Sequence, residues 1–125
     1  MKALRVLVVD DDRDTAEMLA VALQSWGHIP QVAYDGAEAI ILAPKILPQV
    51  VLLDLAMPGL DGVDVATRFR AQEWGAEAKI IAITGLRRAE DLKLAESVGI
   101  DFYLLKPADL KELQNLLSRI QVSID

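Results

Sequence analysis

The 125-residue sequence contains no cysteine and no long apolar run. The absence of cysteine excludes disulfides, thiolate chemistry and cysteine-based zinc sites. No apolar stretch approaches the ~20 residues that a membrane-spanning helix needs. The first residues also lack the long apolar region and small-residue cleavage site of a signal peptide. We therefore expect a cytoplasmic protein that makes no contact with a membrane.

Clustered basic residues are scarce as well. Lysine and arginine number 13 against 19 aspartates and glutamates, which gives a formal net charge of −6, and the one tight basic pair is Arg87-Arg88. Nucleic-acid binding usually requires a cluster of basic side chains that neutralises phosphates, so direct nucleic-acid binding is not expected. With 53% hydrophobic residues and no repeat, low-complexity segment or linker, residues 1–125 are predicted to form a single domain with its own core.

Short β-branched runs alternate with longer amphipathic ones, which is the pattern of repeated βα units. Strands are predicted at 4–9, 29–33, 50–53, 79–83 and 101–105, and helices at 12–26, 35–43, 61–72, 88–99 and 108–121. Several of the strands are apolar throughout, as in parallel sheets covered by helices on both faces. Five such units predict an α/β fold with a doubly wound, five-stranded parallel sheet, whose strand order the pattern leaves open.

Residues at the predicted helix ends explain where the helices start and stop. Asp12, Asp35 and Asp61 are placed to cap the helices that follow them. Gly99 is a predicted C-terminal stop, and Pro44 is predicted to end or distort the second helix because proline cannot continue the backbone bonding.

Three further residues invite a functional interpretation, but structural roles are expected for them. The lone histidine, His28, is predicted to lie in a surface loop without a role in phosphotransfer. Trp26 and Trp74 each precede a glycine and are predicted to pack at helix ends rather than against a cofactor.

Polar residues follow the strands that are predicted to be central. They are Asp10, Asp11 and Asp12 after the first strand, Asp54 after the third, Thr84 after the fourth and Lys106 after the fifth. Each of them taken alone has an ordinary structural explanation as a cap, a strand residue or a solvated side chain. Ligands of open α/β sheets bind at the carboxyl ends of the strands, so this set is expected to converge on one rim.

Three carboxylates on one rim predict a cation between them. Asp10, Asp11 and Asp54 would raise one another's pKa unless a positive charge lay nearby. A hard divalent ion such as Mg²⁺ fits oxygen ligands of this kind. Lys106 adds a second positive charge and Thr84 a hydroxyl donor, and an aspartate can accept a phosphoryl group. The pattern therefore indicates a site for phosphoryl transfer, where the metal and the lysine would stabilise the transferring charge.

The sequence resembles the receiver domains of two-component response regulators, the chemotaxis-type (βα)5 family. The matching segments are VLVVDDD at 6–12, DGAEA at 35–39, LLDLAMPGLDG at 52–62, AITG at 82–85 and YLLKP at 103–107. They occur in the family's order and spacing and cover essentially the whole chain. The resemblance implies a flavodoxin-like sheet with strand order 2-1-3-4-5.

The resemblance also implies a role for each residue of the rim. Asp54 matches the phosphoacceptor, which takes its phosphoryl group from a phosphohistidine. Asp10, Asp11, Asp54 and the backbone carbonyl of Ala56 match the ligands of Mg²⁺, for which Mn²⁺ is a possible substitute. Lys106 matches the lysine that pairs with phosphoryl oxygens, and its bond to Pro107 is expected to be cis.

Two switch residues and a signalling face are implied in the same way. Thr84 matches the hydroxyl that turns toward the phosphoryl group, and Tyr103 matches the aromatic side chain that moves inward on activation. The signalling face would involve roughly residues 87–121.

The implied partners are a sensor histidine kinase or phosphotransfer protein, and an effector protein or attached output domain of unknown identity. A phosphorylation-dependent dimer is a further expectation. The chain would catalyse its own phosphorylation and slow dephosphorylation without being a turnover enzyme. An alternative is that it is the receiver of a larger hybrid kinase or transcription factor.

Other classes of protein fit the sequence less well. A haloacid-dehalogenase-like phosphatase needs a second aspartate two residues after the nucleophile, where this chain has Ala56. A flavodoxin-like carrier would need a phosphate loop after the first strand instead of three carboxylates. A P-loop nucleotide binder would need a glycine-rich loop with its lysine, and a module with a dead site would be expected to lack some site residues.

The positions that tune dephosphorylation in the family, two beyond the acceptor and two beyond the switch threonine, hold Ala56 and Leu86. Neither side chain can orient an attacking water. The resemblance therefore implies a relatively long-lived phosphorylated Asp54.

Overall fold

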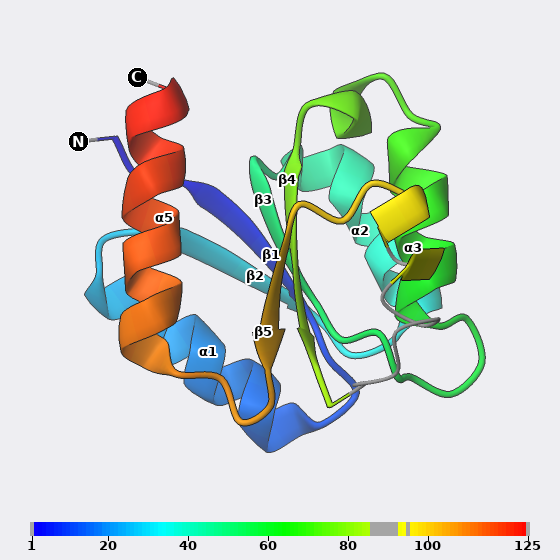
Figure 1. The fold of residues 1–125 in the computed structure, drawn as a ribbon, viewed down its shortest axis with the longest axis horizontal. Coiled ribbons are helices and arrows are strands. Elements are labelled where there is room, and N and C mark those ends of the chain that lie inside the picture. Colours follow the sequence, from blue (N-terminus) through cyan, green and yellow to red (C-terminus); the bar gives the residue numbers. More distant parts are fainter. Residues whose placement is uncertain (1, 86–92, 95, 125) are drawn as a thin grey trace.

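A computed structural model of the protein describes residues 2–85, 93–94 and 96–124 (Figure 1). The strands are β1 (Arg5–Val9), β2 (Ile29–Ala33), β3 (Val50–Leu53), β4 (Lys79–Thr84) and β5 (Phe102–Leu105). The helices are α1 (Arg13–Ser25), α2 (Gly36–Ile46), α3 (Gly62–Arg70) and α5 (Leu110–Ile124), together with the short 3-10 helix η1 (Trp74–Ala76). All five strands begin and end within one residue of the predicted positions.

The predicted helix 88–99 lies largely outside the described residues. Residues 93–94 and 96–97, which are described, are helical. Gly99 has φ +89, a left-handed conformation that suits glycine at the end of a helix, and Ile100 after it is buried. The predicted stop is therefore confirmed, whereas the predicted start of this helix is not among the described residues.

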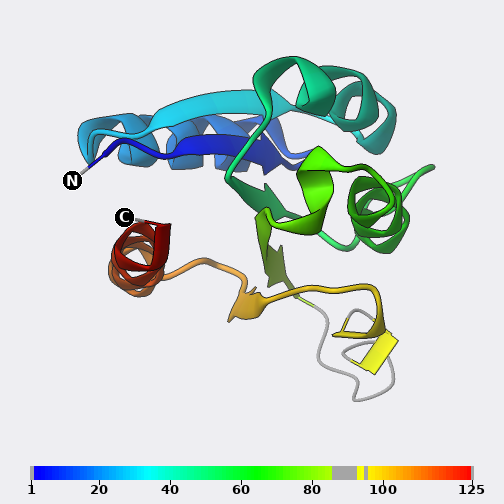
Figure 2. The same cartoon turned by 90° about the horizontal axis from the view of Figure 1, so that it is seen from above.

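The strands form one parallel sheet in the order β2-β1-β3-β4-β5, which confirms the doubly wound fold. Helices α1 and α5 cover one face of the sheet, and α2 and α3 cover the other (Figures 1 and 2). One half of the core packs β-strand side chains such as Val8 against Leu19 and Leu117, and the other half packs Leu53 against Val65. Because β1, β3 and β4 are covered on both faces, their side chains are apolar on both faces too.

The predicted helix caps are confirmed at all three aspartates. The side chain of Asp12 accepts a hydrogen bond from the Asp14 N–H at 3.2 Å. Asp35 accepts from Glu38 at 2.7 Å and Asp61 accepts from Asp64 at 2.9 Å. Each cap fixes the point at which the chain leaves the rim of the sheet and enters a helix.

Pro44 does not end α2, and the prediction that this helix stops at residue 43 is wrong. The helix continues to Ile46 and ends at Leu47, which has φ 50. Proline removes only its own N–H, so residues after it can still donate, and the Leu47 N–H bonds the Ala43 carbonyl at 2.9 Å. Pro44 therefore costs the helix one hydrogen bond, the one to the Ile40 carbonyl, without breaking it.

His28 is buried, and its prediction as a surface-loop residue is also wrong. Its exposed fraction is 7%, and its Nδ1 accepts a hydrogen bond from the Leu4 N–H at 3.1 Å. Gly27, with φ +89, turns the chain from α1 into β2 and carries the imidazole under the start of β1. By contrast, the predicted packing of the tryptophans is confirmed: Trp26 lies against the core near α1, and Trp74 lies edge-on to Phe69.

We predict that His28 makes the fold sensitive to acid. Burial lowers the pKa of His28, so the folded protein favours the neutral ring whose Nδ1 can accept from Leu4. A histidine whose pKa is lower in the folded state stabilises the fold at pH values above its unfolded-state pKa. This stabilisation is lost as the pH falls from the unfolded-state pKa to the folded-state pKa. The free energy of unfolding should therefore decrease between about pH 7.5 and pH 5, the range that spans the ordinary histidine pKa of about 6.5.

Urea unfolding of His28→Asn and His28→Ala checks this prediction. The amide oxygen of asparagine can replace the Nδ1 acceptor without titrating, so His28→Asn should lose less stability in acid than the wild type. His28→Ala should be about 1–2 kcal/mol less stable at neutral pH because the Leu4 N–H is left without an acceptor. Equal acid dependence in the wild type and His28→Asn would contradict the assignment.

Candidate phosphoryl-transfer site

The carboxyl ends of β1 and β3 deliver two aspartates to the same edge of the sheet. The backbone N–H of Asp10 bonds the Ala33 carbonyl at 3.2 Å, and that of Asp54 bonds the Val9 carbonyl at 2.9 Å. Both carboxylates therefore lie at the point where the hydrogen-bonded pairing of the strands ends. Asp10 and Asp54 are 2% and 4% exposed, whereas Asp11 is exposed. The two buried acids therefore require compensation from neighbouring donors and cations.

Backbone amides and one lysine provide that compensation. Oδ1 of Asp10 accepts from the Asp12 N–H at 2.9 Å, and Oδ1 of Asp54 accepts from the Ala56 N–H at 3.0 Å. The Lys106 Nζ lies 3.1 Å from Oδ2 of Asp10 and 3.1 Å from Oδ2 of Asp54. The Lys106 backbone N–H bonds the Thr84 carbonyl at 3.0 Å, which anchors the lysine where β4 and β5 end. A single ammonium group therefore bridges two buried carboxylates.

The environment raises the pKa of both partners of the Asp54–Lys106 pair. Burial raises the pKa of Asp54 and the charge of Asp10 raises it further, while the Ala56 N–H and Lys106 partly oppose the rise. Burial acts to lower the pKa of Lys106, but the hydrogen bonds and charges of Asp54 and Asp10 outweigh it and raise that pKa. Lys106 thus stays protonated, and an ionised Asp54 is less well stabilised than an aspartate in water.

The acidic side chains also meet the requirements of a divalent metal ion. One carboxylate oxygen from each of Asp10, Asp11 and Asp54 lies within 4.8 Å of the others. Three carboxylates against one ammonium leave two negative charges when all are ionised, which a divalent cation would neutralise. All the donors are oxygens, the ligands that Mg²⁺ prefers. Ala56, the predicted carbonyl ligand, is an exposed residue of the loop that follows Asp54.

Of the two predicted switch residues, one lies at the end of β4 and the other lies within β5. Thr84 is the last residue of β4 and is fully buried. Tyr103 is half-buried in β5 and packs against the side of the core that α3 covers. Burial raises the pKa of the Tyr103 hydroxyl, and the nearby charges of Glu96 and Asp101 raise it further. The Lys106-Pro107 peptide is cis, as predicted. Leu86 and the parts of the predicted signalling face at 87–92 and 95 lie outside the described residues.

Two features of the rim escaped prediction. Gly62, at the start of α3, packs against the backbone carbonyl of Asp54 so closely that a side chain would collide with it. The Arg13 guanidinium lies 4.1 Å from the centre of the Tyr34 ring, whose hydroxyl bonds Glu17. The Asp-Gly pair at 61–62 was the available signal for the first feature, but it also marks an ordinary turn. The second joins Tyr34, which follows β2, to residues of α1, and no local pattern connects them.

In the described part of the chain no helix has the length and apolar character required to cross a bilayer. The family model for the response regulator receiver domain matches residues 6–118.

Two curated relatives illustrate the range of chain lengths in which similar sequences occur. An uncharacterized 14.6 kDa protein of Leptolyngbya boryana is 39% identical over 91% of this chain and 87% of its own length. The DNA-binding response regulator MtrA of Mycobacterium tuberculosis H37Rv is 38% identical over 87% of this chain but only 46% of its own length. The chain thus spans about half the length of its MtrA relatives.

Solved structures share the whole fold. The chemotaxis protein CheY4 of Vibrio cholerae has a TM-score of 0.90 and 28% identity, covering 95% of this chain and 99% of CheY4. The receiver domain of the sensor histidine kinase PA1611 from Pseudomonas aeruginosa PAO1 has a TM-score of 0.85 and 30% identity, covering 94% of this chain and 97% of that domain; its structure has a magnesium ion coordinated in the active-site cleft. With the family model matching residues 6–118 and this sheet order, the chain belongs to the response regulator receiver domains of two-component signalling.

Proposed function

We propose that residues 1–125 form a single receiver domain that takes a phosphoryl group from a phosphohistidine onto Asp54 in a Mg²⁺-dependent step. The donor would be a sensor histidine kinase or a phosphotransfer protein. The observation that carries this proposal is the buried Asp54, held 3.1 Å from Lys106 and within a cluster of three carboxylates. This arrangement combines a nucleophile, a fixed positive charge and oxygen ligands for a metal.

The chemistry of the step requires no further residue type. An oxygen of Asp54 attacks the phosphorus, the P–N bond of the donor breaks, and the electron pair stays on the imidazole nitrogen. Bound Mg²⁺, held by Asp10, Asp11, Asp54 and the Ala56 carbonyl, would supply charge neutralisation at the phosphoryl oxygens. The Lys106 ammonium, already beside Asp54 Oδ2, would pair with a phosphoryl oxygen.

The proposed product stays attached to the chain and acts as a signal. Phosphorylation adds up to about two negative charges beside Lys106 and Thr84. New contacts of the Thr84 hydroxyl, together with inward movement of Tyr103, would bias the surface formed by residues 87–121. An effector protein, an attached output domain or a second phosphorylated copy would read that surface. This activity would take place in the cytoplasm, and a chain with a formal net charge of −6 would not bind nucleic acid directly.

A phosphatase of the haloacid-dehalogenase type is a weaker candidate. Its general acid would have to occupy position 56, where the alanine side chain cannot transfer a proton. The chain is therefore proposed to catalyse its own phosphorylation and a slow dephosphorylation, and not the turnover of free substrates.

Incubation of the full chain with Mg²⁺ and acetyl phosphate, followed by intact-mass measurement, tests the proposal. The expected result is a gain of one phosphoryl group that EDTA prevents and that hydroxylamine removes, as it does from acyl phosphates. A chain that gains no mass with Mg²⁺ present would contradict it. A panel of phosphorylated sensor kinases then identifies the physiological donor.

We predict that phosphorylated Asp54 is lost faster when water can be oriented beside it. Ala56 is exposed and lies two residues after the acceptor, and Leu86, which is outside the described residues, holds the other tuning position. Ala56→Asn combined with Leu86→Glu should shorten the lifetime of the phosphorylated protein several-fold, because both new side chains can hydrogen-bond an attacking water. The decay of the mass adduct after removal of acetyl phosphate measures this, and an unchanged lifetime in the double variant would contradict it.

A further inference from the structure

Arg70, the last residue of α3, joins three other segments of the chain through one guanidinium group. Its Nη1 donates to the Gly75 carbonyl at 2.7 Å and to the Ala78 carbonyl at 2.6 Å. Its Nε and Nη2 donate to the Gly99 carbonyl at 3.2 Å and 2.6 Å, and Nη2 also donates to Oδ2 of Asp101 at 2.8 Å. Arginine carries five N–H donors in a rigid plane, so this one side chain holds the segment before β5 against η1 and the segment before β4.

Asp101 extends these contacts into the sheet. Its Oδ2 also accepts from the Ile80 N–H at 2.8 Å, and its backbone N–H donates to the Ile80 carbonyl at 2.9 Å. The guanidinium packs directly on Gly99, where φ is +89 and a Cβ would lie 2.8 Å from Nε of Arg70. The side chains of Arg70 and Asp101 are 20% and 29% exposed, so water screens this ion pair less than a pair on the open surface. We call Arg70, Gly99 and Asp101 the Arg70 clamp.

The Arg70 clamp lies at the end of the sheet opposite to the acidic rim. Asp101 bonds Ile80, the second residue of β4, whereas the Lys106 N–H bonds the carbonyl of Thr84, the last residue of β4. Four residues of strand separate these two points, a distance of about 13 Å. Tyr103 lies in β5 between them. The strand β5 therefore runs from the clamp, through the predicted switch tyrosine, to the phosphoryl-transfer site.

We propose that Arg70 is a positioning residue that keeps the start of β5 fixed while the rim end of the signalling face moves. The proposal rests on phosphorylation of Asp54, the function proposed above. New contacts of Lys106 with a phosphoryl group would displace the rim end of β5. The hydrogen bonds of the clamp would resist that displacement at residues 99–101, so these residues act as the hinge end of the strand. Movement would then be confined to Tyr103 and the residues nearer the rim.

Nuclear magnetic resonance of the nitrogen-15-labelled full chain tests the proposal, with spectra recorded before and after incubation with Mg²⁺ and acetyl phosphate. The backbone amide signals of Tyr103 and Lys106 should shift on phosphorylation, and those of Gly99 and Asp101 should shift much less. Intact mass of the same sample reports whether the chain carries the phosphoryl group. In a fully phosphorylated sample, shifts at Gly99 and Asp101 as large as that at Tyr103 would overturn the clamp and leave the proposed function standing.

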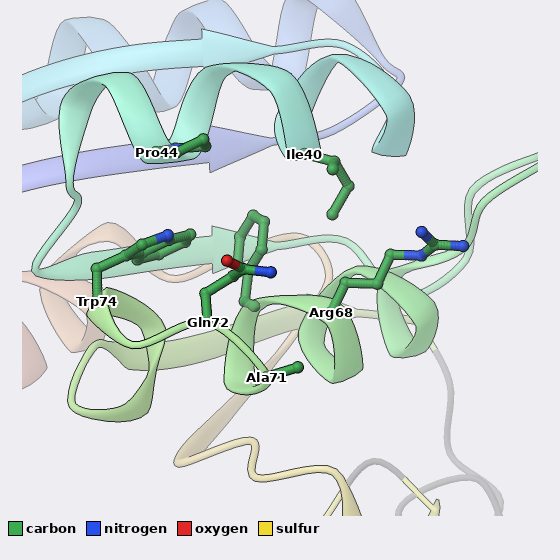
Figure 3. Close-up of a pocket in the computed structure, with 7 residues that line it drawn as sticks. Ile40, Pro44, Arg68, Ala71, Gln72 and Trp74 are labelled. Carbon is green, nitrogen blue, oxygen red and sulfur yellow. The ribbon is translucent and has the colours of Figure 1, made fainter.

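Two arginines in the last turn of α3 provide a matched pair of variants. Arg70→Met removes all the donors of the clamp, so phosphorylation should shift the amide signals of Gly99 and Asp101 as strongly as that of Tyr103. Arg68 lies on the side of α3 that faces α2, beside a cavity of about 260 Å³ between these helices (Figure 3). Arg68→Met should therefore keep the wild-type pattern of shifts. The same pattern of shifts in both variants would overturn the role of Arg70.

Asp101→Asn is a milder variant that separates positioning from stability. The amide oxygen can still accept from the Ile80 N–H, but it loses the charge that strengthens the bond to Arg70. The shift of the Gly99 signal on phosphorylation should lie between those of the wild type and Arg70→Met. If both variants melt at a lower temperature but keep the wild-type pattern of shifts, Arg70 only stabilises the fold and the proposal is overturned.

Discussion

Replacing Asp54 by asparagine is expected to abolish the gain of one phosphoryl group on incubation with Mg²⁺ and acetyl phosphate. The amide has no nucleophilic oxygen equivalent to a carboxylate, and it removes one of the three acidic oxygens that lie within 4.8 Å of one another. The expected loss is complete. Among the described residues, Asp10 is the one other buried carboxylate that pairs with Lys106, and the metal would occupy it. Intact mass measures the result.

The loss should not be a consequence of unfolding. The pKa of Asp54 is raised in the fold, so its ionised form costs stability above that pKa, and the cost is relieved as the pH falls through it. An uncharged residue at position 54 removes this cost, and Lys106 keeps Asp10 as a partner. At neutral pH we therefore expect the free energy of unfolding of Asp54→Asn to equal or exceed that of the wild type.

Asp12→Asn is the matched control for this experiment. Asp12 belongs to the same acidic run, but it is exposed and caps α1, a role that asparagine fills equally well. This variant should gain the phosphoryl group as the wild type does. A full adduct on Asp54→Asn would show that another residue is the acceptor and would contradict the proposed site.

Adding a single methyl group at position 62 is expected to destabilise the whole domain. A Cβ on Gly62 would collide with the Asp54 carbonyl oxygen and lie 2.6 Å from the Leu55 Cα. Both are backbone atoms of the chain leaving β3, so neither can rotate away as a flexible side chain would. Over-packing of this kind typically costs 1–3 kcal/mol, and contact with rigid backbone puts Gly62→Ala near the upper end, at about 3 kcal/mol.

Thermal and urea unfolding check this prediction, and the expected fall in melting temperature is roughly 10 °C for a domain of this size. Any shift of the Asp54 backbone would also move its carboxylate relative to Lys106, so the rate of phosphorylation should fall as well. Gly85→Ala is the control, because Gly85 is exposed and a Cβ there meets no atom within 4 Å. A Gly62→Ala variant as stable as the Gly85→Ala variant would contradict the close approach seen in the fold.

Local patterns in the sequence determined the secondary structure and the residue types at the rim. Apolar β-branched runs such as 50–53 and amphipathic runs such as 110–120 have periods that depend only on neighbouring residues, so their boundaries could be predicted closely. Asp10, Asp54 and Lys106 could be placed on one rim because parallel strands end at the same edge of a sheet. Asp12 could be separated from the metal ligands because a cap acts within one turn of its helix.

The burial of particular side chains was decided by the tertiary structure. His28 accepts from Leu4, a residue 24 positions away, and Gly62 meets the carbonyl of Asp54 across a loop. The bridge from one lysine to two aspartates and the unpartnered indole N–H of Trp74 also arise only when separate elements cross. Such contacts depend on how strands and helices distant in the chain pack, and hydrophobic periodicity carries no information about that packing. The sequence by itself therefore determined which groups reach the rim, and tertiary packing decided how they are paired, buried and spaced.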